Sequence, residues 1–418
     1  MVIVVKSKGP QEVPDVFEEL YVRLALWWRS RTGPVKAYLG RKPYGKTVFV
    51  PTVGSIRVAA VQMSPRPATR SRDFAEQIYR LTREAADQGA EMVVFPDHVT
   101  LPLLALVPGL DQVLSDSGSL EEALATVASV ELDPEPDRAG GTEERGGVVH
   151  ASARVPRDAG GSRESPDAEP EMSFDEDDSL IRLADVVSLA TNATDRLYRA
   201  VFATLARRFR IYIAAGSALL LQRDGRVLAV SHLFDPRGQI ILTQPRTHLR
   251  NWERAWGLGS ATELSVIDTP LGRVGSLGAG ESMIFEPTRI LWSLGAEVVC
   301  SQTADVGPQL PGHLLRGAWA RVQESPSYAV QGALSGDAFG LTFDGTAAIF
   351  APRELTEARD GIVARVRAGH GEDAVVVADL DLNALRSLRV GQPRPLNRAM
   401  IGSYLPELYT HPWPWTEP

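Results

Sequence analysis

A short apolar run that ends in a glycine turn and leads into a predicted helix constrains the fold of this chain most strongly. It reads LGRVGSLGAGESMIFE. Residues 274–277 are typical of a buried strand, residues 278–280 break it, and a helix is expected from about Met283 to Leu294. This order indicates an α/β fold, in which such a turn places a nucleophile or an anion at a helix N-terminus. The tip of the turn, however, is Ala279, which can neither attack nor ionise.

Strand-like and helical patterns alternate through most of the chain. A strand at 56–63, a helix at 74–88 closed by Gly89 and a strand at 91–95 predict a βαβ-type unit. Further expected helices lie at 183–208, 311–323 and 383–388. Further expected strands lie at 211–221, 226–234, 239–243, 263–268, 297–300, 328–333, 345–350, 361–366 and 374–380. The sequence therefore predicts a mixed α/β domain, from about residue 55 to 409.

The N-terminal residues 1–54 form a predicted extension with one amphipathic helix. The segment Val16–Arg31 has helical periodicity, with its large apolar residues near one side. We favour a helix that packs on the main domain over one that binds a membrane surface or a partner, because Glu18 and Glu19 disfavour a membrane.

Residues 110–180 differ in composition from the rest of the domain. They contain nineteen acidic residues and five arginines, a formal net charge of −14, and few long apolar runs. This composition predicts a disordered acidic insert. Residues 410–418 form a short Pro- and aromatic-rich C-terminal tail.

Composition excludes several classes of function. A net charge of −8 gives no support for nucleic-acid binding, and no apolar run is long enough for a membrane span. The single cysteine, Cys300, rules out an internal disulfide framework and a multi-cysteine zinc site. No metal or nucleotide motif occurs, so no cofactor is expected. The N-terminus lacks the apolar core of a signal peptide, and we expect a cytoplasmic protein.

The order and spacing of nine sequence pieces resemble the nitrilase, or carbon–nitrogen hydrolase, superfamily. The pieces are IRVAAVQM at 56–63, GAEMVVFPD at 89–97, DPRGQIILTQPRTHL at 235–249, LGRVGSLGAGESMIFEP at 271–287, WSLGAEVVCSQTA at 292–304, AWARVQESPSYAVQGA at 318–333, DGTAAIFAPREL at 344–355, VVVADLDLNALRSLR at 375–389 and YLPELY at 404–409. The resemblance implies a nitrilase-like four-layer α-β-β-α sandwich.

The family hydrolyses amides or nitriles with a cysteine, a glutamate and a lysine, and this chain departs from it at all three positions. The resemblance places Asp97 at the glutamate position, with an arm one methylene shorter. It places Arg246 at the lysine position, where a planar guanidinium replaces an ammonium. It places Ala279 at the cysteine position, which removes the nucleophile that covalent catalysis requires.

The resemblance also implies neighbours for these positions. Glu281 stands where the family usually has an aspartate, and Met283 replaces a family arginine. Glu253 is the counterpart of a further family glutamate, and His248 stands where the family often has a histidine. We expect Asp97, Arg246, Glu253 and Glu281 to converge on one pocket, either to hold a small polar ligand or as a structural ion cluster.

Other nucleophiles do not fit this site. Cys300 falls inside a predicted strand, so a buried structural thiol is expected. Ser276 lies before the turn, and Ser282 is expected to cap the following helix. Neither serine has a histidine at motif spacing.

Two hypotheses follow. The favoured one is a non-catalytic nitrilase-fold protein that serves as a ligand-binding, scaffold or regulatory subunit. The other is an active carbon–nitrogen hydrolase with a non-standard site that uses Asp97 and Arg246. The resemblance further implies a homo-oligomer or a partner subunit, with residues 283–294 and the N-terminal helix as candidate contact faces.

Overall fold

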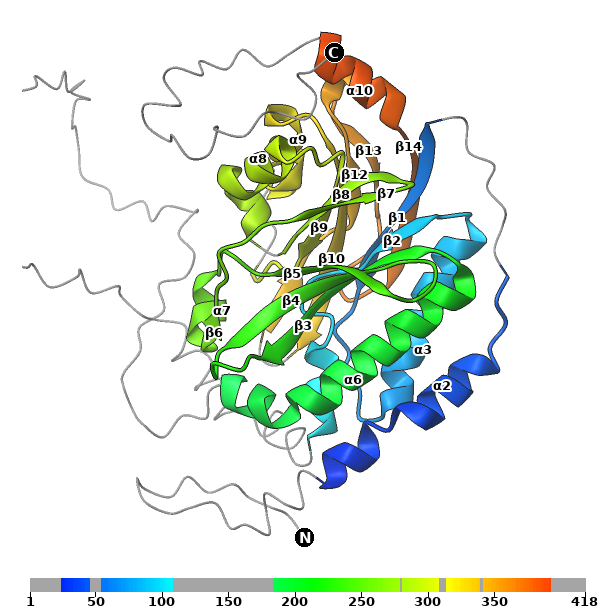
Figure 1. Ribbon diagram of the computed structural model, residues 1–418, viewed down its shortest axis with the longest axis vertical. Coiled ribbons are helices and arrows are strands. Elements are labelled where there is room, and N and C mark those ends of the chain that lie inside the picture. Colours follow the sequence, from blue (N-terminus) through cyan, green and yellow to red (C-terminus); the bar gives the residue numbers. More distant parts are fainter. Residues whose placement is uncertain are drawn as a thin grey trace, which may run out of the picture.

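The computed structural model describes residues 24–45, 54–107, 183–278, 280–307, 313–338 and 341–391 (Figure 1). The predicted insert at 110–180 and the tail at 410–418 lie outside the described residues.

The strands form a single fourteen-stranded mixed sheet. They are β1 Ser55–Met63, β2 Met92–Val94, β3 Tyr212–Leu221, β4 Val227–Phe234, β5 Ile240–Pro245, β6 Leu258–Gly259, β7 Val266–Thr269, β8 Gly272–Leu277, β9 Val298–Thr303, β10 Tyr328–Ala338, β11 Leu341–Asp344, β12 Ala348–Phe350, β13 Ile362–Arg365 and β14 Ala374–Asp381. The main path runs β5-β4-β3-β2-β1-β10-β9-β8-β7.

The sheet consists of two halves that share a core. Strands β1 and β10 are paired at only two positions, Gln62 with Ala333 and Met63 with Leu334. Side chains from strands of both halves, such as Val58 on β1 and Val298 on β9, belong to one apolar cluster. The intervening residues on β1, such as Ala59, face a second cluster that also contains helix side chains. This alternation is what buried strands covered on both faces require.

Helices cover the outer face of each half. The α-helices are α2 Thr32–Gly40, α3 Ser71–Asp87, α6 Leu183–Phe209, α7 Asn251–Ala255, α8 Phe285–Ser293, α9 Ala318–Glu324 and α10 Leu382–Gly391, with one further helix at 24–29. The 3-10 helices are η1 Leu101–Leu106, η2 Glu281–Met283, η3 His313–Leu315 and η4 Arg353–Leu355.

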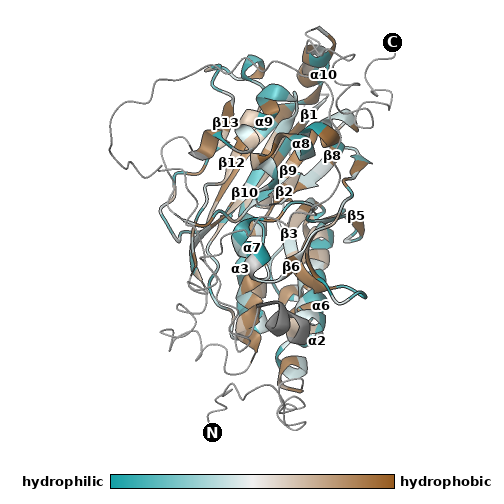
Figure 2. Cartoon of the chain, turned by 90° about the vertical axis from the view of Figure 1, so that its left-hand side faces the viewer, coloured by the Kyte–Doolittle hydropathy of each residue, from teal (hydrophilic) through white to brown (hydrophobic). Residues whose placement is uncertain are grey.

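The helices complete a four-layer arrangement. In Figure 1, α3 and α6 lie on one side of the strands and α8 and α9 on the other. Apolar side chains of α8 pack on β8 and β9, and those of α9 pack on β10 and β12. Figure 2 shows bands of hydrophilic and hydrophobic residues along α6, as expected for a helix with one buried face. The predicted α-β-β-α sandwich is therefore confirmed.

Helix α3 shows how local sequence selects the observed structure. Its predicted apolar positions, Phe74, Ile78, Leu81 and Ala85, are all buried. Gly89 follows the helix with φ of +82°, a conformation that glycine adopts without the steric cost of a Cβ.

Two expectations at the N-terminus and near the turn need correction. The described part of the predicted helix Val16–Arg31 is helical only at 24–29, and a second helix, α2, follows it unpredicted. Instead of one helix from Met283, the chain forms the 3-10 turn η2 and then α8. Ser282 lies inside η2 and does not cap α8, whose N-cap residue is Ile284.

No helix within the described ranges combines the length and apolar character needed to cross a bilayer.

Candidate functional site

Four of the predicted site residues meet at the ends of four structural elements. Asp97 follows β2, Arg246 follows β5, Glu253 lies in α7 and Glu281 begins η2. None of the four residues is more than 2% exposed. The expected convergence of these charges is therefore present as a closed, buried group, which we call the Arg246 cluster.

The guanidinium of Arg246 faces three different carboxylates. Its Nη2 donates to Asp97 Oδ2, its Nη1 donates to Glu253 Oε1 at 2.9 Å, and its Nε lies 3.7 Å from Glu281 Oε2. Burial disfavours the charged guanidinium, but the three carboxylates outweigh this effect and raise the pKa of Arg246 above its ordinary value. The planar fork of an arginine suits such multiple engagement better than an ammonium does.

Glu281 connects the glycine turn to the loop that carries Arg246. Its Oε1 accepts hydrogen bonds from Thr247 N at 2.7 Å and Thr247 Oγ1 at 2.6 Å. Its Oε2 accepts from Gly278 N at 2.6 Å. One carboxylate thus satisfies backbone donors from two segments and also faces Arg246, so it fixes the turn against the cluster.

Glu253 brings an unpredicted residue, His98, into the cluster. Its Oε1, which accepts from Arg246, also lies 2.7 Å from His98 Nε2, and its Oε2 accepts from Arg250 N at 2.8 Å. His98 has φ of +49°, uncommon for a residue with a Cβ, and its ring packs against Trp252. The sequence signal was only its position after Asp97.

The cluster also contains atoms of the types that ligate metals. One ligand atom each of Asp97, His98 and Glu253 lies within 4.8 Å of the others. However, the same oxygen atoms of Asp97 and Glu253 already accept hydrogen bonds from Arg246. A metal ion would therefore compete with a guanidinium for both carboxylates, and the donor set does not fit a metal while Arg246 is present.

The glycine turn approaches Arg246 closely. A Cβ placed on Gly278 would clash with the guanidinium nitrogens, and Gly280 adopts φ of +77°. Ala279 lies between them, outside the described residues. The two flanking glycines are thus required by the packing and the backbone, whatever the chemistry of the turn.

The alternative nucleophiles are buried in the strands or the turn. Cys300 on β9 belongs to the core between the sheet halves, and burial raises the pKa of its thiol to about 12. Such a thiol carries negligible thiolate near neutral pH. Ser276 on β8 is paired with Cys300 across the sheet, and Ser282 is also buried. The expectation of a structural cysteine is confirmed for its burial.

His248 lies apart from the cluster. Its side chain is exposed, and its Nδ1 lies 2.9 Å from Thr247 Oγ1. Only its backbone reaches the cluster, through a 3.3 Å hydrogen bond from His248 N to Glu281 Oε1. The structure therefore does not bring this imidazole to the other predicted site residues.

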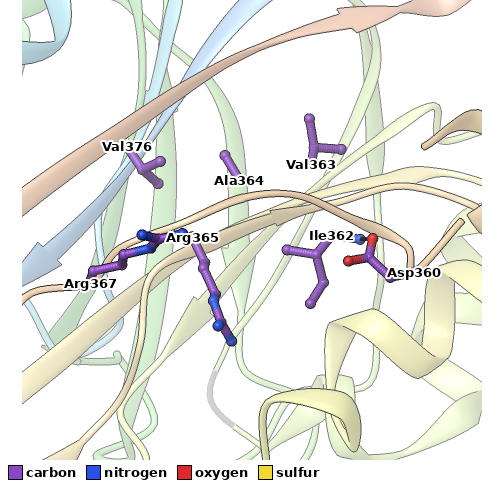
Figure 3. A pocket seen from close by; sticks show the side chains of 7 residues that line it. All are labelled: Asp360, Ile362, Val363, Ala364, Arg365, Arg367 and Val376. Carbon is purple, nitrogen blue, oxygen red and sulfur yellow. Dashed lines mark hydrogen bonds between the residues drawn. The ribbon is translucent and has the colours of Figure 1, made fainter. Parts of the chain in front are cut away.

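An open depression lies elsewhere, beside β13 and β14 (Figure 3). Its volume is about 460 Å³, and none of the predicted site residues lines it. The lining residues are Asp360, Ile362, Val363, Ala364, Arg365, Arg367 and Val376. This depression and the Arg246 cluster are distinct features, and only the depression is open to solvent.

Comparison with known proteins agrees with this architecture. The yeast protein Nit3, from Saccharomyces cerevisiae and described as a member of branch 10 of the nitrilase superfamily, aligns with a TM-score of 0.53. The alignment covers 84% of this chain and 99% of that chain at 16% identity. An amidase from Nesterenkonia sp. aligns with a TM-score of 0.51 over 86% of this chain and all of its own, also at 16% identity. These likenesses show the fold.

Sequence relatives point in the same direction. The chain is 26% identical over 210 residues to the probable hydrolase YhcX of Bacillus subtilis, which covers 46% of this chain and 38% of that protein. It is 31% identical over 105 residues to the bifunctional nitrilase/nitrile hydratase NIT4 of Oryza sativa, which covers 25% and 28%. The matched regions thus span less than two fifths of these relatives. The family model for carbon–nitrogen hydrolases matches residues 174–390, more than half of the sequence. The chain belongs to the carbon–nitrogen hydrolase family.

Proposed function

We propose that this chain does not carry out the covalent hydrolysis typical of its family and acts as a ligand-binding, scaffold or regulatory subunit. The observation that carries the proposal is the Arg246 cluster, in which one guanidinium engages three buried carboxylates. A general base and an oxyanion stabiliser must both be available to a substrate. Here Asp97 and Arg246 are occupied with each other.

The missing nucleophile supports the same proposal. The sequence has alanine at position 279, and the only cysteine of the chain, Cys300, is buried in the core with a pKa of about 12. An amide or a nitrile carbon would have no thiolate to attack it. The Arg246 cluster then serves to hold the turn, the loop after β5 and the segment after β2 together.

The same proposal includes association with a second subunit, either a copy of this chain or a partner, through α8. Phe285 at the start of this helix is 42% exposed, and the guanidinium of Arg289 lies 5.7 Å from its ring centroid. An exposed aromatic residue next to an arginine is a composition common in protein interfaces. A small polar ligand is the further proposed partner.

A reversion series tests the proposal. One solved structure of the Nesterenkonia amidase shows covalent addition of the acetamide moiety of fluoroacetamide at the active site cysteine. We expect no such adduct on this protein by intact-mass spectrometry, and no ammonia release from a panel of amides and nitriles. We expect an adduct only in the triple variant Ala279→Cys, Arg246→Lys, Asp97→Glu, since a thiol alone would still face a closed cluster.

Two results would contradict the proposal. The first is ammonia release by the unmodified protein that survives Cys300→Ala and is abolished by Asp97→Asn, which would establish hydrolysis through the non-standard site. The second is an adduct on the unmodified protein at any residue that turnover then releases. Arg365→Lys serves as a matched control, because this exposed arginine lies on β13.

A further inference from the structure

The first two described helices form an anchored pair at one end of the molecule. The helix at 24–29 buries Leu26, and α2 buries Val35 and Leu39 in the same apolar cluster as side chains of α3 and α6. In Figure 1 this pair, in dark blue, lies at the lower end of the long axis, and α10 lies at the upper end. We call it the N-terminal helix pair.

The helix at 24–29 exposes an apolar face opposite to Leu26. Leu24, Trp27 and Trp28 are 56%, 53% and 64% exposed. They stand at positions i, i+3 and i+4, which share one side of a helix. They are three of the seven large hydrophobic side chains found exposed in the described ranges. Such clustering marks a contact surface, since exposed apolar residues are otherwise scattered singly.

The same segment is basic, although the whole chain is acidic. Residues 24–45 carry five basic residues and no acidic residue, whereas the net charge of the chain is −8. Lys42 is paired with Glu76 of α3 at 2.7 Å, so its charge is compensated. The four others are all exposed: Arg29, Arg31, Lys36 and Arg41.

One of these basic side chains lies on the apolar face itself. The guanidinium of Arg31 lies 5.4 Å from the ring centroid of Trp27 and 4.7 Å from that of Trp28. A cation beside two exposed indoles places positive charge at the edge of an apolar patch. Indoles favour the boundary between headgroups and acyl chains, and basic side chains favour anionic headgroups.

We propose that the N-terminal helix pair docks on the surface of an anionic lipid bilayer. Leu24 and the two indoles enter the interface, and the basic residues contact lipid phosphates. Charge complementarity favours this occupant over a second copy of this acidic chain only through the basic segment itself. A nucleic acid would use the charges and the indoles, but it would leave Leu24 without an apolar partner. The contact is peripheral and requires no spanning helix.

Cosedimentation of the full chain with vesicles tests this proposal. We expect binding to vesicles of phosphatidylcholine mixed with phosphatidylserine, weak binding to phosphatidylcholine alone, and weakening by salt. Trp27→Ser with Trp28→Ser reduces affinity on the order of tenfold for each indole withdrawn from the interface. Lys36→Glu with Arg41→Glu reduces it at least about thirtyfold, from about fivefold for each basic residue.

Matched controls lie at other surfaces of the molecule. Arg365→Glu with Arg367→Glu makes the same change of charge beside β13, and Phe285→Ser removes an exposed aromatic residue from α8. Neither variant should alter vesicle binding. Circular dichroism should show that all variants fold, because every substituted side chain is at least partly exposed.

Several results would overturn the proposal. They are no binding of the unmodified protein to anionic vesicles, or equal loss of binding in the control variants. Binding to an oligonucleotide but not to vesicles would assign the surface to nucleic acid instead. Self-association that depends on Trp27 and Trp28, measured by light scattering without vesicle binding, would assign it to a second copy.

Discussion

Two buried arginines of this protein keep their guanidinium groups out of water in opposite ways. Arg246 faces three carboxylates, which raise its pKa although burial opposes them. Arg389, on α10, donates to two main-chain carbonyls, Pro326 O at 2.8 Å and Ala296 O at 2.5 Å. Burial lowers the pKa of Arg389 to about 10, and the attraction of Glu297 offsets this only in part.

The difference separates two uses of a buried cation. At Arg389 the charge is incidental, because carbonyl oxygens accept hydrogen bonds from a neutral donor as well. At Arg246 the charge is essential, because three carboxylates would otherwise be buried without compensation. The first site joins backbone segments, and the second balances charge. Removal of each side chain should therefore have consequences of different size and different pH dependence.

The largest effect is expected for Arg246→Ala. Breaking a buried ion pair costs about 3–5 kcal/mol, because the remaining charge is uncompensated. We expect a decrease of this order in the free energy of unfolding at neutral pH, measured by urea denaturation. The loss should shrink as the pH falls, since protonation neutralises the carboxylates left behind.

Two further variants sharpen this result. Arg246→Met combined with Asp97→Asn and Glu253→Gln removes the charges together and should recover much of the lost stability. If Arg246→Ala costs less than about 1 kcal/mol, the size expected for an exposed pair, the distinction between the two arginines fails.

A smaller effect is expected at His232, a buried group that avoids charge altogether. Burial lowers the pKa of this imidazole on β4 to about 3 from an ordinary value of 6.5. Below about pH 6.5 the unfolded chain takes up a proton that the folded protein does not, so acid destabilises the fold down to about pH 3. The slope is about 1.4 kcal/mol per pH unit for one proton.

The variant His232→Phe should remove this slope. Its ring would join the aromatic neighbours Tyr198 and Phe234, and the lost contact, to Thr243 Oγ1, involves an exposed residue. Urea denaturation across pH 4 to 7 measures the effect, and His248→Asn is the control because its imidazole is exposed. An unchanged acid dependence in His232→Phe would show that the imidazole is protonated in the folded state.

The smallest effect is expected for Arg389→Met. This variant leaves two buried carbonyls without a donor, and we expect a loss of about 1–2 kcal/mol. The loss should be the same throughout pH 5 to 8, because no carboxylate accepts a hydrogen bond from this guanidinium among the contacts described above. A strong pH dependence would indicate that Arg389 balances charge, as Arg246 does.

Much of the fold was predictable because its elements carry strong periodic patterns. Helix α3 shows a full apolar stripe, and β3 and β14 are continuous apolar runs. Helix α2 was missed because Gly33 and Pro34 suggest a loop, although proline is tolerated in the first turn of a helix. Strand β11 was missed because its four residues, Leu341–Asp344, are too few for a period and depend on pairing with β10.

The site was predictable in membership but not in arrangement. The family resemblance supplied Asp97, Arg246, Glu253 and Glu281, which do converge. It could not show that the guanidinium faces three carboxylates at once, because that depends on side-chain packing. His98 was missed because no spacing rule links it to Glu253, which lies 155 residues away in the sequence.

The closeness of Gly278 to Arg246 has a consequence for how this chain can change over generations. A side chain at position 278 would clash with the guanidinium, so the arginine and the glycine cannot be exchanged independently. A substitution at position 278 is acceptable only after a smaller residue has replaced Arg246, and that step alone exposes the buried carboxylates to their mutual repulsion. The accessible mutational paths away from the present arrangement are therefore few, and they are ordered.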